Sequence, residues 1–79
     1  MSGEDALEIP MTQVDSSSIH SHGFDDVSGT LDIKFRNGKT YRYYGVSADT
    51  YQGMQESDSI GSFARKNIIG NYKTEKLGD

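Results

Sequence analysis

Two histidines in the first third of this 79-residue sequence are spaced so that they could bind a metal ion. His20 and His22 are two positions apart, so on a β-strand both rings would point to one side, with Asp25 or Asp32 near enough to add a carboxylate. Two imidazoles without a third firmly placed ligand seldom hold zinc, and solvated surface histidines are common. We therefore expect no bound metal and no cofactor.

The aromatic and basic run Tyr41-Arg42-Tyr43-Tyr44 could stack on the bases of a single-stranded nucleic acid. Aromatic rings and guanidinium planes on an open sheet hold unpaired bases with about 1–3 kcal/mol each. Side chains alternate along a strand, however, so Tyr41 and Tyr43 would share one side, and we assign this pair to the core. The outward side would form a small ligand-binding patch, which consists of His22, Lys34, Arg42 and Tyr44.

An expected helix start provides a third candidate site. The residues Ser59-Ile60-Gly61-Ser62 would present free backbone N–H groups at the positive end of a helix dipole, which attracts anions. Simple capping by a serine explains the same residues, because every helix start needs partners for its N–H groups. If a phosphate bound there, its pocket would be formed by Ser59, Gly61, Arg65 and Lys66.

No catalytic residues are expected. The sequence contains serines and histidines, but no Gly-x-Ser-x-Gly elbow, no paired carboxylates in a suitable context and no Walker loop. A chain of this length also leaves little concavity from which water could be excluded. The sequence therefore predicts a protein that is not an enzyme.

The charge distribution limits how a nucleic acid could be bound. Residues 1–26 carry six acidic groups and no Lys or Arg, whereas residues 27–79 carry eight basic and six acidic groups, a net charge of +2. Bulk attraction to phosphates needs many cations on one surface, so an RNA-binding role would rest on stacking and a few placed charges. The lack of cysteine and of a long apolar stretch predicts a cytoplasmic protein without a membrane partner.

The central element of the expected fold is a β-hairpin around Asn37 and Gly38. A three-residue loop with Gly38 in the left-handed conformation pairs Ile33 with Tyr41 and makes one side of the hairpin wholly apolar. The same register places Asp32 opposite Arg42 on the polar side. The alternative two-residue loop would place charges in the apolar stripe and is rejected.

The remaining elements follow from turn and cap signals. A first strand is expected at residues 19–24, with Phe24 opposite Thr30 so that His22 faces Asp32. Residues 11–17 form a short lead-in strand or an extended arm. Ser47 would cap a helix at residues 48–55, and Asp58 or Ser59 a helix at residues 60–69, after which Tyr72 and Leu77 belong to an extended tail.

These elements predict an α+β protein, a three-stranded antiparallel meander covered on one face by two C-terminal helices. Residues 1–10 are acidic and short of aromatic side chains, so we expect a disordered tail there and one domain over residues 11–79. The opposite face of the sheet is expected to be open to water. A domain this small would gain stability by pairing, which makes a homodimer plausible.

An ordered set of short motifs connects these elements to a known family. The set consists of Val14-Asp15-Ser16-Ser17-Ser18-Ile19, Gly23-Phe24-Asp25, Leu31-Asp32-Ile33-Lys34-Phe35-Arg36-Asn37-Gly38, Tyr41-Arg42-Tyr43, Gly45-Val46, Tyr51, Ser59-Ile60-Gly61-Ser62-Phe63, Ile68 and Tyr72. It resembles the KTSC domain, a short module of certain lysyl-tRNA synthetase C-termini that also occurs in free-standing bacterial and phage proteins. Ser47 replaces a usual proline and Phe24 a usual tyrosine, and neither change affects the expected fold.

The resemblance implies a small non-enzymatic binding module, and its synthetase context suggests RNA as the ligand. Two alternatives remain open. The net acidity and the short chain suit a phage-like protein-interaction inhibitor of a bacterial defence or host enzyme. The helix start at Ser59 and the aromatic side chains suit a nucleotide-sequestering protein that binds its ligand at a subunit interface.

Overall fold

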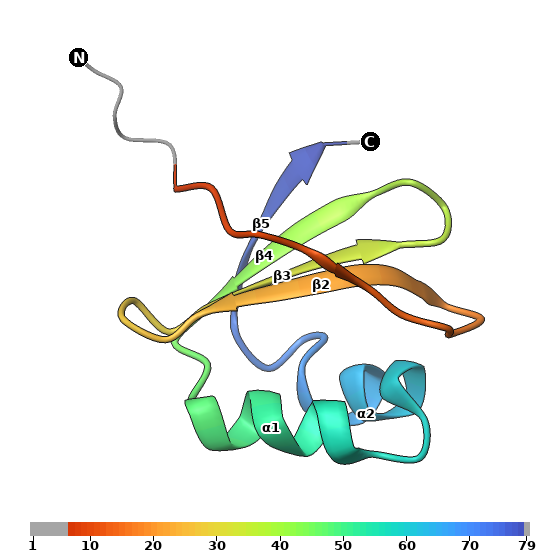
Figure 1. Cartoon of the computed structure of the whole chain (residues 1–79). Coiled ribbons are helices and arrows are strands. Elements are labelled where there is room, and N and C mark those ends of the chain that lie inside the picture. Colours follow the sequence, from red (N-terminus) through yellow and green to blue (C-terminus); the bar gives the residue numbers. More distant parts are fainter. Residues whose placement is uncertain (1–6, 79) are drawn as a thin grey trace.

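The computed structural model describes residues 7–78, which form an α+β fold with a five-stranded antiparallel sheet and two helices on one face of it (Figure 1). The elements in chain order are β1 (Thr12–Gln13), β2 (Ile19–Asp25), β3 (Thr30–Phe35), β4 (Thr40–Tyr44), α1 (Ala48–Glu56), α2 (Ile60–Asn67) and β5 (Lys73–Gly78). The strands lie in the sheet in the order in which they follow along the chain. Neither helix in residues 7–78 is long and apolar enough to cross a membrane.

The β3–β4 hairpin has the loop and register that the sequence predicts. The Phe35 amide donates to the Lys39 carbonyl at 2.9 Å, which leaves a three-residue loop, and Gly38 takes a φ of 90°. Only glycine adopts such a φ without strain. The opposed residues are Thr30 and Tyr44, Leu31 and Tyr43, Asp32 and Arg42, Ile33 and Tyr41, and Lys34 and Thr40.

The sheet has five strands rather than the three expected. The lead-in segment does form a short strand, in which Thr12 lies opposite His22. The expected extended tail is the edge strand β5, which pairs with β4 along its whole length. Its sequence, Lys-Thr-Glu-Lys-Leu-Gly, is charged and lacks apolar alternation, so the period-two pattern that predicts a strand is missing.

The two sides of the sheet are lined by different side chains. We call the side covered by α1 and α2 the helix face, with Leu31, Ile33, Tyr41 and Tyr43, and the opposite side the outer face, with Asp32, Lys34, Arg42 and Tyr44. The expected register of β2 is wrong by one residue, because Phe24 lies opposite Leu31 rather than Thr30. This shift arises at the turn, where Asp25 lies opposite Thr30, and it places His22 opposite Ile33 on the helix face. A bulge between Ile19 and Ser21 follows farther from the turn.

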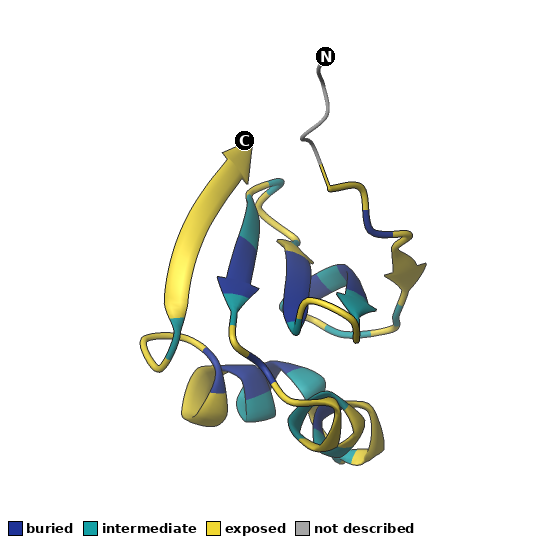
Figure 2. Ribbon diagram, turned by 90° about the vertical axis from the view of Figure 1, so that its left-hand side faces the viewer, coloured by how far each residue is buried: buried dark blue, intermediate teal, exposed yellow. Residues whose placement is uncertain are grey.

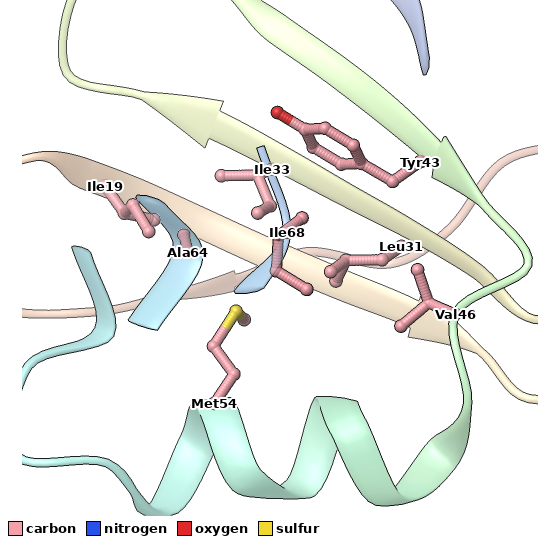
Figure 3. Close-up of a cluster of buried hydrophobic side chains, with 8 residues drawn as sticks. All are labelled: Ile19, Leu31, Ile33, Tyr43, Val46, Met54, Ala64 and Ile68. Atoms are coloured by element: carbon pink, nitrogen blue, oxygen red, sulfur yellow. The ribbon is translucent and has the colours of Figure 1, made fainter. Parts of the chain in front are cut away.

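Helix α1 begins at the predicted cap Ser47, and α2 begins at Ser59, one of the two caps that the sequence left open. The Ser47 hydroxyl accepts from the Thr50 amide at 3.1 Å, and the Ser59 hydroxyl accepts from the Ser62 amide at 3.2 Å. The apolar sides of both helices pack on the helix face, and the buried side chains lie between the sheet and the helices (Figure 3). This core consists of Ile19, Leu31, Ile33, Tyr43, Val46, Met54, Ala64 and Ile68. Asn67, the last residue of α2, is exposed.

Candidate functional site

A buried ion pair occupies the centre of the outer face. The Arg42 guanidinium donates to both carboxylate oxygens of Asp32, from Nε to Oδ1 at 2.8 Å and from Nη2 to Oδ2 at 2.8 Å. This paired geometry and the charge of Asp32 raise the pKa of Arg42 above its usual range. Arg42 lies on the outer face as expected, but it is only 9% exposed, so the expectation that its side chain is open to a ligand is wrong.

The chain before β1 covers this ion pair. Residues 7–11, which we call the N-terminal segment, run along the outer face, on the side away from the helices (Figure 1). The Leu7 carbonyl accepts from Nη2 of Arg42 at 2.7 Å, and Ile9 is buried. At Gly23 a side chain would meet the Pro10 carbonyl oxygen at 2.2 Å, so the close approach requires glycine. Part of the expected tail therefore lies on the sheet, and residues 1–6 are outside the described residues.

The other two residues of the expected patch on the outer face remain accessible to different degrees. Lys34 is exposed, and Tyr44 is half-buried and donates its hydroxyl to Oε1 of Glu75 at 2.5 Å. These two side chains lie at opposite ends of the β3–β4 pairing with the buried Arg42 between them, so they do not form one continuous patch. The outer face is therefore partly closed rather than open to water.

His22 lies on the other side of the sheet, against α1. Its Nδ1 is 2.7 Å from the Tyr51 hydroxyl, and the Tyr51 ring stacks on Phe24 with centroids 4.7 Å apart. Burial lowers the pKa of His22, which keeps the imidazole neutral near pH 7. His22 thus connects β2 to α1 and is not available in the outward patch, contrary to expectation.

The residues expected at the α2 start do gather at that helix, on the opposite side of the sheet from Arg42 and Tyr44. Gly61 is buried, and a side chain there would meet the Ser18 hydroxyl at 3.0 Å. Arg65 Nη2 donates to the Ser62 hydroxyl at 3.2 Å, and Lys66 is exposed. The eight expected ligand-binding residues therefore belong to separate surfaces and do not form one site.

The two histidines that could have bound a metal have different partners. Nδ1 of His20 lies 3.0 Å from the Ser21 hydroxyl, whereas His22 contacts Tyr51. Within residues 7–78, no three His, Asp or Glu side chains gather in a cluster that could hold a metal ion.

An aromatic pocket of about 390 Å³ lies between the C-terminal end of α2 and the helix face of the sheet. Its walls are Phe35, Asn37, Tyr41, Tyr43, Ile69, Gly70 and Thr74. The rings of Phe35 and Tyr41 meet edge to face with centroids 6.0 Å apart. Figure 3 shows the Tyr43 ring beside Ile33 with its hydroxyl turned away from Met54.

The pocket offers flat apolar surface together with neutral hydrogen-bonding groups. Burial raises the pKa of Tyr43, so its hydroxyl stays protonated and can donate at neutral pH. The Asn37 side-chain oxygen accepts from the Lys39 amide at 2.9 Å, which leaves its NH₂ group to donate. No charged side chain belongs to the walls, and Lys39 and Lys73 are next along the chain to the hairpin loop and to Thr74. Such a pocket suits a neutral, planar ligand with polar edges.

Sequence reasoning missed this pocket for two reasons. Tyr41 and Tyr43 were assigned to the core, which is correct for Tyr43, but the apolar stripe extends past the area that α2 covers. Thr74 belongs to a strand that the sequence does not signal. The exposed Ile69 just after α2 was the available hint, because it continues the apolar side of the helix beyond the helix end.

Comparison with known proteins gives a consistent result. The family model of the KTSC domain matches residues 15–72. A protein from Tsukamurella paurometabola is 34% identical over 67 residues, which cover 85% of this chain and 100% of that protein. The crystal structure of a KTSC domain protein from Yersinia pestis has a TM-score of 0.86 and 34% identity, and covers 90% of this chain and 100% of that chain.

A longer relative is the lysine–tRNA ligase of Nostoc sp.. It is 26% identical over 73 residues, which are 92% of this chain and 13% of the ligase. The present chain therefore corresponds to a small part of that enzyme.

Proposed function

Since this chain belongs to the KTSC domain family, we propose that it is a non-enzymatic module that binds single-stranded RNA and takes one unstacked base into the aromatic pocket. The observation that carries the proposal is the pocket itself, with the rings of Phe35, Tyr41 and Tyr43 in its walls. Its volume lies in the range of roughly 300–1,000 Å³ that small-molecule sites occupy. Stacking on such rings contributes about 1–3 kcal/mol per base.

The neutral walls fit a base better than a phosphate. Hydroxyl and amide groups of Tyr43 and Asn37 can donate to the edge of a base, while the backbone phosphates would stay outside the pocket, near Lys39. The net charge of +2 over residues 27–79 provides few phosphate contacts. Binding would therefore depend on salt only weakly.

The kinship with lysine–tRNA ligases supports RNA as the class of ligand. A ligase of that name acts on a tRNA, and its segment similar to this chain covers 13% of its length. A module that holds an unpaired nucleotide would suit such an enzyme as an additional contact with its RNA.

Fluorescence anisotropy with labelled single-stranded oligoribonucleotides tests the proposal. The informative variant is Ile69→Asp, which places a carboxylate on an exposed wall residue of the pocket without removing a core side chain. We expect it to weaken RNA binding about tenfold, the loss of roughly 1.4 kcal/mol of stacking. The matched control is Val27→Asp, the same type of change at a 92% exposed turn residue, and it should bind like the wild type.

Other outcomes would overturn the proposal in distinct ways. Loss of binding in a Lys34→Ala/Tyr44→Ala variant with no effect of Ile69→Asp would assign the RNA to the outer face. Absence of binding to every oligonucleotide at low salt would exclude RNA. We expect free nucleosides to compete with the RNA for the pocket, because the base is the group that enters it.

The sequestration of a free nucleotide is a second candidate, because the pocket volume exceeds that of one base. In that case a nucleotide should bind more tightly than any oligomer of the same base. Thermal-shift measurements with nucleosides, linear nucleotides and cyclic nucleotides, each with and without Ile69→Asp, distinguish the two functions.

A further inference from the structure

The outer edge of β5 has no neighbouring strand in residues 7–78. β5 pairs with β4 on one side only, and all six of its residues are exposed (Figure 2). A strand edge presents unpaired backbone N–H and C=O groups that can pair with another strand. We propose that β5 pairs antiparallel with β5 of a second copy of this chain, so that two sheets join across a two-fold axis.

The charges on β5 select one register for this pairing. Opposed residues in a continuous sheet point to the same side, so under two-fold symmetry only residues an even number of positions apart can face each other. With Thr74 on the axis, Lys73 of each copy faces Glu75 of the other. With Glu75 on the axis two carboxylates meet, and with Lys73 or Lys76 on the axis two ammonium groups meet, which is unfavourable.

The local structure of β5 suits the register with Thr74 on the axis. Lys73 and Glu75 lie opposite Tyr44 and Arg42 of β4, so both charges are on the outer face. The Tyr44 hydroxyl donates to one carboxylate oxygen of Glu75 and leaves the other oxygen for an ammonium group. The irregularity in the pairing with β4 comes only after Lys76, so the part of the edge needed for pairing is regular.

Lysines on an edge strand commonly prevent pairing with other strands. Here Lys73 meets Glu75 when Thr74 is on the axis, Leu77 when Glu75 is on the axis, and Lys73 of the other copy when Lys73 is on the axis, so the charge on Lys73 favours the first of these registers. The pairing also has a consequence for the aromatic pocket. Thr74 is part of its wall, so the pockets of the two copies would lie on either side of the axis, on the helix face.

Cysteine cross-linking tests the axis directly, because the chain contains no cysteine of its own. In Thr74→Cys two copies of the new residue would face each other with Cα atoms about 4.5–5.5 Å apart, a distance that a disulfide spans. The matched control is Val27→Cys, a highly exposed residue of the turn between β2 and β3. A short edge buries little area, so the dimer is weak and protein concentrations of roughly 0.1–1 mM are required.

We expect Thr74→Cys to form the covalent dimer at least ten times faster than Val27→Cys under mild oxidation. Equal rates would overturn the proposal. The wild-type chain should sediment as a dimer, with twice the mass of 8.7 kDa, at the highest concentrations. A monomer at all concentrations would also overturn it.

Charge exchange tests the register. In Glu75→Lys, Lys73 of each copy faces the introduced lysine of the other copy. We expect this repulsion to raise the dimer dissociation constant about tenfold. The double variant Lys73→Glu/Glu75→Lys restores opposite charges and should restore the dimer. Glu56→Lys makes the same charge change at the end of α1 and should have no effect. A dimer that Glu75→Lys leaves unchanged would exclude this interface.

Discussion

Replacing Gly23 with Ala tests whether the N-terminal segment is packed on the outer face as a part of the fold. An Ala Cβ would lie 2.2 Å from the Pro10 carbonyl oxygen and 2.9 Å from Cγ2 of Ile9. Because the first neighbour is backbone, the overlap can be relieved only if the segment moves away from the sheet. Overpacking of this kind costs about 1–3 kcal/mol. We expect Gly23→Ala to lower the free energy of unfolding by about that amount, and the Tm by roughly 4–8 °C per kcal/mol.

A chain without residues 1–11 provides the matched background for this measurement. Gly23 then has no segment above it, so Gly23→Ala should change the free energy of unfolding by no more than a few tenths of a kcal/mol. Urea unfolding followed by circular dichroism gives the four free energies of this double-mutant cycle. A similar loss in both backgrounds would refute the reasoning, because the strain would then arise within the sheet. An unchanged full-length variant would refute it as well.

Two further predictions concern the buried polar groups. Asp32→Ala leaves the Arg42 guanidinium buried without its carboxylate, so urea unfolding should show a loss of about 3–5 kcal/mol, and Asp32→Leu combined with Arg42→Met should lose much less. An equal loss in both would contradict this account of the ion pair. Burial lowers the pKa of His22 below its ordinary 6.5, so the unfolded chain takes up the proton first and the free energy of unfolding should fall as the pH drops below about 6.5. His22→Gln should flatten this dependence, and an identical slope in the variant would contradict the assignment to His22.

The β3–β4 hairpin could be predicted to the residue because two independent constraints agree on it. The glycine at position 38 limits the loop, and the alternation of Leu31, Ile33 and Phe35 with charged residues rejects the competing register. The helix starts were predicted to within one residue, since Ser47 and the pair Asp58-Ser59 each precede a segment with helical spacing. Local chemistry is sufficient for such elements.

The features that were missed depend on contacts between distant parts of the chain. The turn between β2 and β3 has four residues rather than the expected five, because Asp25 and not Phe24 lies opposite Thr30, so His22 was placed on the wrong face. The ion pair of Asp32 and Arg42 was expected in its correct register, but its burial was not, because the covering segment is short and irregular. Gly23 within a strand was the one signal of that cover, since such glycines mark close backbone approach.

The sheet order has a consequence for the way this chain folds during synthesis. Every pair of adjacent strands is consecutive in the sequence, so β1 to β4 can pair one after another as they leave the ribosome. Only the β4–β5 pairing must wait, because residues 45–72, with both helices, intervene. Low contact order in the first four strands favours their fast assembly. The pairing of β5 with β4 then fixes the segment that contains both helices. We therefore expect the nascent chain to acquire its meander first and its helical layer as a final, single step.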